Sequence, residues 1–424
     1  MCGSCNSFET SAGSGSEFQN GVSNCLDVKT LNDLSSAAWR KVRDHAQALF
    51  TRLALGPRAG CLVVLASLLV VPPAPAAGRK TENVVLIISD GFRWQEVFGG
   101  AEEALLTKIA GGVTDPDALR TAYWRATPAS RREALLPFFW DEIARHGQLL
   151  GNQRKGSVVR VTNGRNFSYP GYNEILTGAA DPRIDSNAKK PNPNVTVFEW
   201  LNGRPKFRDH VAILGTWNVF PYIFNVERSQ LPIWPAWEAK FGAREIAPPA
   251  WVADQMRDTT PMWEDVTYDA FLVHAATDHL TRRHPRVMFV GFGETDEWAH
   301  AGRYDHYLTA AHHLDRFVQR LWETAQAIPQ YRDKTTFILT ADHGRGDGLV
   351  NWKDHGEKIA GSDGDWLAIL GPDTPPLGER ENGAPVTHNQ IAATIAALLG
   401  EDFAAAFPQA GAPIRELLPA PARR

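Results

Sequence analysis

The chain has 424 residues, with 44 Lys and Arg against 48 Asp and Glu and a formal net charge of −4. Its apolar content of 43% is that of a globular protein, which excludes a wholly disordered chain and a coiled coil. The near-neutral charge gives no general attraction to nucleic acid or anionic membranes. We therefore expect no binding of nucleic-acid duplexes, and an anionic substrate has to be held by local chemistry such as metal ions.

The four cysteines all lie in the first 61 residues, at positions 2, 5, 25 and 61. The remainder of the chain therefore holds no disulfide, no thiolate metal site and no cysteine nucleophile. Cys2 and Cys5 form a C-x-x-C pair, but no second pair follows at zinc-finger spacing. We interpret this pair as incidental to a flexible leader.

The first 77 residues read as a leader that is separate from the fold. We interpret residues 1–50 as disordered or as the result of a translation start placed too far upstream. Residues 51–77 combine basic positions, the apolar run CLVVLASLLVV at 61–71 and small residues up to Ala77, which is a signal-peptide pattern. We expect export to the periplasm or the medium, with no stable membrane anchor after cleavage. The alternative is a buried strand or helix at 61–71.

From residue 78 onward, apolar β-branched runs alternate with helical patterns. The runs predict strands buried on both faces at Asn83–Ile88, Val211–Gly215, Val287–Gly291, Thr335–Thr340 and Trp366–Leu370. Helical spacing predicts helices at Leu135–His146, Tyr304–Ile328 and Gln390–Leu399. This alternation predicts an α/β domain over residues 78–408, with a mostly parallel sheet sandwiched by helices. We expect inserted cap segments near 101–135 and 215–265, and a tail over 409–424.

Residue types that ligate metals follow the predicted strands, where the reactive groups of parallel sheets collect. Asp90 ends the first strand, and Asp296 and His300 follow the third at a spacing that puts both on one face of a helix. Asp342 and His343 end the fourth strand, and His355 belongs to a second Asp-His-Gly. Carboxylates and imidazoles without thiols suit Zn²⁺, or Mn²⁺ as a harder alternative. Each motif alone would equally suit a cap, an ion pair or a surface histidine, but together they predict a two-metal site.

Three further features are open to two interpretations each. Ser168 lies in a turn before a helical stretch, where its hydroxyl is either a nucleophile favoured by the helix N-terminus or an N-cap. His388, before the last helix, is the alternative to His355 as the third ligand of one metal. The tryptophans of the second cap segment serve as packing or as a substrate platform: Trp217, Trp234, Trp237 and Trp251.

Together these residues resemble the alkaline phosphatase superfamily, nearest to its nucleotide pyrophosphatase/phosphodiesterase branch. The matching motifs span residues 83–400 in the family's order: Asp90-Gly91-Phe92-Arg93, Ser168-Tyr169-Pro170, Thr177-Gly178, Ile184-Asp185 with Asn187, Asp296 with His300, and the two Asp-His-Gly motifs. The resemblance implies an alkaline phosphatase-like fold and two divalent metal ions. One ion would be held by Asp90, Ser168, Asp342 and His343, and the other by Asp296, His300 and His355.

The same resemblance implies a mechanism. Ser168 would attack phosphorus as an alkoxide, Asn187 would donate to a phosphoryl oxygen, and water would then hydrolyse the phosphoserine. The expected protein is an exported metal-dependent hydrolase of small-molecule phosphate esters, acting as a phosphodiesterase or phosphatase.

The departures from the branch define the alternatives. Ser168 replaces the usual Thr, and Tyr172 stands where a sulfatase carries Arg. The alternatives are a sulfatase-like, phosphonate hydrolase-like or phosphoglycerate mutase-like member of the superfamily, and a secreted binding protein that retains the fold without turnover.

Overall fold

The computed structural model describes residues 79–234, 236–237 and 244–419. The chain divides into two units, 1–73 and 74–424, and the described residues belong to the second. The leader and signal peptide predicted for residues 1–77 lie outside the described residues, as do residues 420–424 of the predicted tail.

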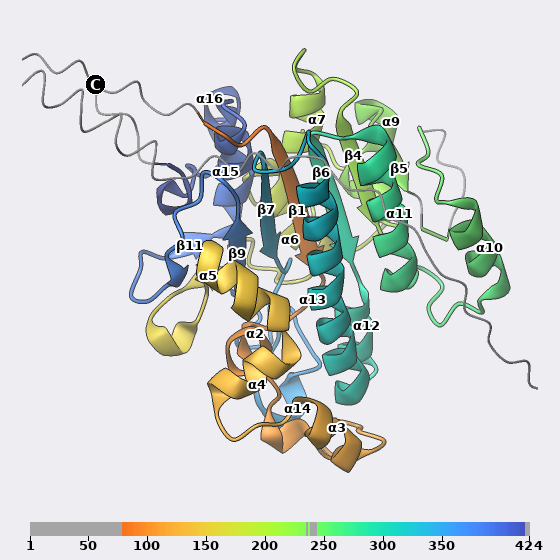
Figure 1. Cartoon of the computed structure of the whole chain (residues 1–424), viewed down its shortest axis with the longest axis vertical. Coiled ribbons are helices and arrows are strands. Elements are labelled where there is room, and N and C mark those ends of the chain that lie inside the picture. Colours follow the sequence, from red (N-terminus) through yellow and green to blue (C-terminus); the bar gives the residue numbers. More distant parts are fainter. Residues whose placement is uncertain (1–78, 235, 238–243, 420–424) are drawn as a thin grey trace, which may run out of the picture. The chain divides into compact units, whose positions relative to one another are not determined.

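The centre of the domain is a sheet with the strand order β10-β2-β9-β7-β1-β6-β4-β5 (Figure 1). Five neighbouring strands run parallel: β7 (Thr335–Thr340), β1 (Asn83–Ser89), β6 (Val287–Phe292), β4 (Val211–Gly215) and β5 (Ile233–Trp234). β9 (Leu367–Leu370) is antiparallel to β7 and to β2 (Gln148–Leu150), and β10 (Gly378–Glu379) is parallel to β2. A small second sheet joins β11 (Val386–Thr387), β3 (Val159–Arg160) and β8 (Gly364–Asp365). The predicted mostly parallel α/β sheet is confirmed.

Helices cover both faces of this sheet, which explains why its central strands β1, β6 and β7 are buried at every position and mostly apolar. Alternate residues of β1 enter two separate cores: Val85 and Ile87 one, and Val84 and Leu86 the other. The first core is closed by α11 (Asp269–Arg283) and α13 (Tyr304–Ala327). The second is closed by α6 (Ser168–Thr177), α7 (Val197–Asn202) and α15 (Ile391–Leu398). Each buried side chain of β1 contributes about 1.5–3 kcal/mol relative to exposure.

The predicted helix at Leu135–His146 is interrupted at Leu136, and residues 137–146 are helical without a further break. α4 (Pro128–Leu135) ends before Pro137, and a π-helical turn η2 (Phe139–Ile143) and α5 (Ala144–His146) follow. The prediction is therefore wrong only at its start, because Pro137 disfavours helical backbone at Leu136 and begins a new helix there. The other predicted helices are confirmed within one or two residues.

The two segments predicted as caps have different structures. Residues 101–135 hold η1 (Glu103–Leu105), α3 (Pro116–Tyr123) and α4, and the last two begin at side-chain N-caps, Asp115 and Thr127. Residues 215–265 hold α8 (Phe220–Ile223), α9 (Val226–Ser229) and α10 (Ala250–Asp258), but also β5, which extends the central sheet. Part of the second segment therefore belongs to the sheet.

The described part of the predicted tail packs onto the domain. Ile414 and Leu417 are buried in the second core, and the backbone N–H of Ile414 donates to Thr394 Oγ1 at 2.9 Å. The apolar positions between the Ala and Pro residues give these residues a buried face, so a loose tail does not describe residues 409–419.

Among the residues that the structure describes, no helix combines the length and apolar character that crossing a membrane requires.

Candidate metal centre

The metal-ligating residue types gather at one edge of the sheet because the parallel strands β7, β1 and β6 all end there. Asp342 and His343 follow β7, and Asp90 follows β1. Asp296 and His300 lie on α12 (Glu294–His300), which begins two residues after β6. The predicted convergence of strand-end residues is therefore present in the fold.

Asp90, Asp342 and His343 form a first group whose ligand atoms all lie within 4.8 Å of one another. His343 Nε2 is 3.3 Å from Asp90 Oδ1 and 3.6 Å from Asp342 Oδ2. All three residues are buried, and each of these atoms lacks a hydrogen-bond partner. Buried polar atoms are rarely left unpaired, so the group requires an explanation.

The protonation of His343 supplies that explanation. Its Nδ1 lies 2.9 Å from the carbonyl oxygen of Gly344, which can only accept, so the ring proton is on Nδ1. Burial lowers the pKa of His343 to about 4, so the ring is neutral and Nε2 presents a lone pair. The lone pair of His343 and the oxygens of the two carboxyl groups therefore face one another. The donor set of the first group therefore fits a divalent cation.

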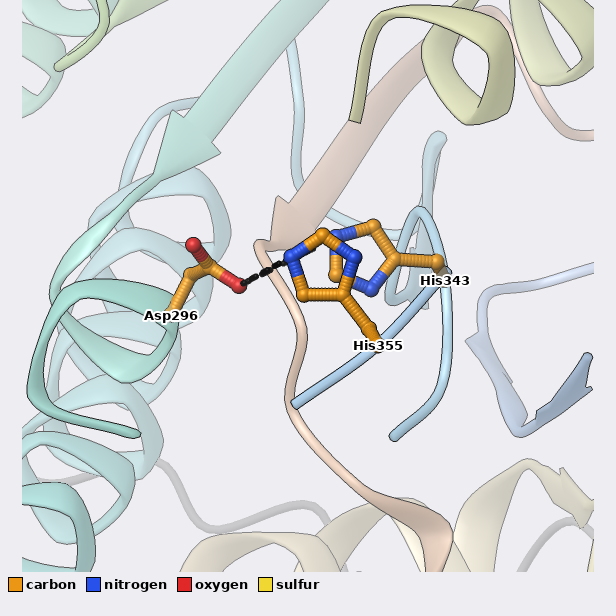
Figure 2. Close-up of side chains that lie close together, drawn as sticks. All are labelled: Asp296, His343 and His355. Atoms are coloured by element: carbon orange, nitrogen blue, oxygen red, sulfur yellow. Dashed lines mark ion pairs between the residues drawn. The ribbon is translucent and has the colours of Figure 1, made fainter. Parts of the chain in front are cut away.

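Asp296, His343 and His355 form a second group, which lies beside the first and shares His343 with it. Asp296 Oδ1 is 3.7 Å from His355 Nε2 and 3.8 Å from His343 Nε2. Figure 2 shows the carboxylate of Asp296 facing the two imidazole rings, whose centroids are 3.9 Å apart. His355 Nδ1 is 3.2 Å from the carbonyl oxygen of Asn166, which again leaves Nε2 directed at the group.

His300 joins this second group from the solvent side. Its Nε2 lies 3.2 Å from Asp296 Oδ2 and 2.9 Å from His355 Nε2. Burial lowers the pKa of His300, but Asp296 outweighs this effect and raises that pKa above its usual value. A carboxylate and two imidazoles therefore converge as a second cation would require.

Asp296 itself is held as an anion. Burial opposes its ionisation, but Arg345 and His300 outweigh burial and hold the pKa of Asp296 well below its usual range. In contrast, burial and the neighbouring carboxylates raise the pKa values of Asp90 and Asp342 well above the usual range. Arg345 also lowers the pKa of Asp90, but there burial and Asp296 outweigh it, whereas it contacts the carboxylate of Asp296 directly.

Ser168 is the first residue of α6 and lies 5% exposed beside both groups. It lines a cavity of about 200 Å³ together with Asp90, Asn187, Asp296 and His300. Phe167 occupies the N-cap position and no side chain caps the helix, so the N-cap interpretation of Ser168 is wrong. Within the described residues, Ser168 Oγ makes no hydrogen bond.

Helix α6 is fixed against the first group by its glycine. A Cβ atom on Gly171 would lie 2.2 Å from the carbonyl oxygen of Asp342, so only glycine allows this approach. One helical turn after Ser168, the hydroxyl of Tyr172 donates to Asp90 Oδ2 at 3.2 Å. The sequence reasoning missed Tyr172 as a site residue, although its four-residue spacing from Ser168 was a usable signal.

The loop before Ser168 is held by a buried carboxylate on the same helix. Glu174 accepts hydrogen bonds from both the backbone and the side chains of Thr162 and Asn163, at 2.5–3.1 Å. This loop leads to Asn166, which contacts His355. Asn187 is held next to Ser168, because its Oδ1 accepts from the backbone N–H of Tyr169 at 3.0 Å.

Other candidate residues lie elsewhere. His388 is fully buried 2.9 Å from Asp365 and belongs to neither group, so His355 and not His388 lies with the ligands. Among the tryptophans of the second predicted cap, Trp217 lines the cavity and Trp234 is buried in the core. Trp251 is 53% exposed.

Solved structures with a similar chain fold include the following three proteins. The lipoteichoic acid synthase LtaP from Listeria monocytogenes is 11% identical with a TM-score of 0.49, covering 76% of this chain and 73% of that one. The phosphonate monoester hydrolase SpPMH from Silicibacter pomeroyi is 15% identical with a TM-score of 0.44 and coverages of 81% and 78%. Murine ectonucleotide pyrophosphatase/phosphodiesterase 5 is 12% identical with a TM-score of 0.44 and coverages of 79% and 100%. No curated protein matches the chain.

A family model described as type I phosphodiesterase / nucleotide pyrophosphatase matches residues 159–386, more than half of the chain. The matched range contains Ser168, Asp296 and His300 of α12, and both Asp-His-Gly motifs. Asp90 precedes the matched range. The chain therefore belongs to the type I phosphodiesterase / nucleotide pyrophosphatase family, a family of hydrolases in the alkaline phosphatase superfamily.

Proposed function

We propose that this protein hydrolyses phosphate esters with Ser168 as nucleophile and two divalent metal ions, Zn²⁺ first and Mn²⁺ as the alternative. Asp90, Asp342 and His343, with Ser168, would hold one ion, and Asp296, His300 and His355 the other. When bound, the ions would supply Lewis-acid activation of the Ser168 hydroxyl and stabilisation of charge on the phosphoryl group. The observation that carries this proposal is that the buried ligand atoms of the first group have no hydrogen-bond partner and lie beside a serine hydroxyl that also makes no hydrogen bond.

The chain's own residues account for the remaining steps. Ser168 Oγ attacks phosphorus from the N-terminus of α6, where the helix dipole favours its anionic form. The Oγ–P bond forms as the bond from phosphorus to the leaving alcohol breaks, and the alcohol departs with a proton. Asn187, which is fixed beside Ser168, donates to a phosphoryl oxygen. Water then attacks phosphorus and the Oγ–P bond breaks; the hydroxyl of the water stays on phosphorus and its other proton goes to Ser168 Oγ.

The charge of the cavity favours diesters over monoesters. Two acidic side chains outside both ligand groups, Asp265 and Glu297, line it, and none of the lining residues in the described part of the chain is Lys or Arg. Burial and the neighbouring carboxylates raise the pKa of Glu297 to about 8, so Asp265 is the charged one of the two at neutral pH. A monoester dianion carries one more negative charge than a diester and finds no Lys or Arg on this wall. We therefore propose a phosphodiester as the preferred substrate.

The test compares wild type, Ser168→Ala and Ser130→Ala on chromogenic phosphodiester, phosphomonoester and sulfate ester substrates. Ser130 is an exposed residue of α4 and serves as the matched control. We expect fastest turnover of the diester, loss of turnover in Ser168→Ala with its metal retained, and an unchanged control. Acid quenching of the wild type during turnover should yield phosphoserine at position 168 by mass spectrometry.

The outcomes also separate the alternatives. Preferred turnover of the sulfate ester would replace the proposal with a sulfatase-type activity. Metal binding without turnover of any ester would indicate the binding protein. A Ser168→Ala variant with wild-type rates would remove Ser168 from its role.

We also propose that the protein is exported and that the mature domain begins near residue 78. The support is the signal-peptide pattern of residues 51–77, which the structure does not describe. N-terminal sequencing of the protein from the periplasm or medium should find a start next to Ala76 or Ala77. Retention in the cytoplasm with an intact leader would contradict this proposal.

A further inference from the structure

Arg345 lies two residues after His343. Its side chain contacts three separate chain segments at the second group. Its side chain is fully buried. Nε donates to the carbonyl oxygen of Gly91 at 3.1 Å, and Nη1 donates to that of Lys353 at 2.5 Å. Nη2 donates to the backbone oxygen of Asp296 at 3.2 Å and also contacts its carboxylate Oδ1. The guanidinium therefore joins the end of β1, helix α12 and the loop that carries His355.

These partners are adjacent to metal-ligating residues. Gly91 follows Asp90, and its backbone N–H donates to Asp342 Oδ1 at 3.0 Å, so the same peptide segment contacts the first group. Lys353 precedes His355 by two residues. Arg345 thus sets the distance between Asp296 and the loop of His355. It also holds both of them against the end of β1, the strand that Asp90 follows.

The position of Gly91 in this arrangement requires glycine. Its φ of +56° lies in the left-handed region, and a Cβ atom would lie 2.6 Å from Asp296 Oδ1 and 2.9 Å from Arg345 Nε. The backbone of the β1 end is therefore in direct contact with the Arg345–Asp296 pair, with no space left for a side chain.

We propose that Arg345 is a positioning residue that builds the second metal site by clamping Asp296 and the His355 loop to the end of β1. This inference rests on the proposed two-metal function. A guanidinium suits the role because its planar fork donates in several fixed directions at once, which a lysine ammonium on a flexible stem does not reproduce. Partners that orient metal ligands in this way typically change metal affinity by about 10–100-fold when removed.

The charge of Arg345 and its geometry have opposite effects on metal affinity at the second site. Arg345 places a positive charge against Asp296, and removal of that charge alone would strengthen the attraction of the site for a cation. If Arg345 acts mainly through its geometry, metal affinity at the second site falls when it is replaced. If it acts only through its charge, affinity rises.

The experiment titrates the metal-free full chain with Zn²⁺ against a chromophoric chelator, which resolves the two binding steps without measuring turnover. Asp296→Asn identifies the step that belongs to the second group. Arg345→Met removes the donors at similar volume, and Arg345→Lys keeps the charge without the fork. Arg380→Met is the matched control, because Arg380 is partly buried and pairs with Glu416 at 3.0 Å, away from both groups.

We expect Arg345→Met to weaken the second step by about tenfold or more and to leave the first step within about twofold of wild type. Arg345→Lys should also bind the second ion more weakly than wild type, and Arg380→Met should match wild type. Melting curves of the metal-free variants check the fold, and Arg345→Lys carries the test if Arg345→Met does not fold. Wild-type or tighter affinity at the second step in the folded Arg345 variants would overturn the proposal. Wild type that binds no metal would instead overturn the proposed function, before any variant is compared.

Discussion

Replacement of Gly171 by Ala tests how closely helix α6, which carries Ser168, must approach the first ligand group. On local grounds this change should stabilise α6 by about 1 kcal/mol, since Ala is the better helix former. The tertiary contact predicts the opposite, because the added Cβ would lie 2.2 Å from the carbonyl oxygen of Asp342, where ordinary contact begins at 3.4 Å. Helix α6 and Asp342 must then separate by about 1 Å, and overpacking of this kind costs about 1–3 kcal/mol.

The same displacement moves Ser168, which lies one helical turn before Gly171, away from Asp90 and Asp342. A misplacement of about 1 Å at a reacting group typically lowers the rate by about 10²-fold. We therefore expect Gly171→Ala to lose up to about 2 kcal/mol of unfolding free energy net of the helix propensity. We also expect kcat/KM to fall by about 10²-fold while metal content is retained.

Denaturant unfolding and steady-state kinetics on a diester measure the two effects. Gly383→Ala is the matched control, because a Cβ atom there would come no closer than 4.0 Å to a neighbour. A Gly171→Ala variant that is more stable than wild type and equally active would show that α6 does not depend on this contact, and would refute the reasoning.

Three further predictions follow from single side chains, two of them near the site and the third at a distant carboxyl group. Glu174→Gln should lower the unfolding free energy by about 1–3 kcal/mol in denaturant titrations, because it leaves donors of the loop before Ser168 unpaired; an unchanged midpoint would contradict this. His355→Ala should lower the metal content per chain by elemental analysis, whereas His388→Ala should not; the reverse result would make His388 the ligand. Burial raises the pKa of Asp315 from 3.8 to about 7, so the folded state holds a proton that the unfolded state releases, and stability falls as pH rises through this window. Asp315→Asn should therefore show a smaller difference in Tm between pH 4 and pH 7 than wild type, and an equal difference would refute the assignment.

The parts of the fold that the sequence predicted are those with a local cause. The strands at the centre of the sheet are mostly apolar because both of their faces are buried, and that pattern is visible without a structure. The four-residue spacing of Asp296 and His300 places both on one face of α12 for the same kind of reason. The break at Pro137 was also local, but the apolar spacing around it obscured it.

The parts that the sequence did not predict depend on contacts between distant segments. Arg345 contacts Gly91 across 254 positions, and no local pattern indicates that pairing. His343 was expected to serve one ion only, yet its Nε2 lies within reach of both ligand groups. The burial of Ile414 and Leu417 likewise depends on where α15 lies, which is set by the sheet and not by the residues near the end of the chain.

Two bound ions at the edge of the sheet are the central claim, and anomalous diffraction from crystals of the purified protein at the zinc edge, paired with elemental analysis, tests it most directly. Two ions per chain are predicted, one bounded by Asp90, Asp342 and His343 and the other by Asp296, His300 and His355. Their removal by a chelator should abolish ester hydrolysis, and added Zn²⁺ or Mn²⁺ should restore it. Protein free of metal whose hydrolysis is insensitive to chelators, or ions bound away from these residues, would contradict the account.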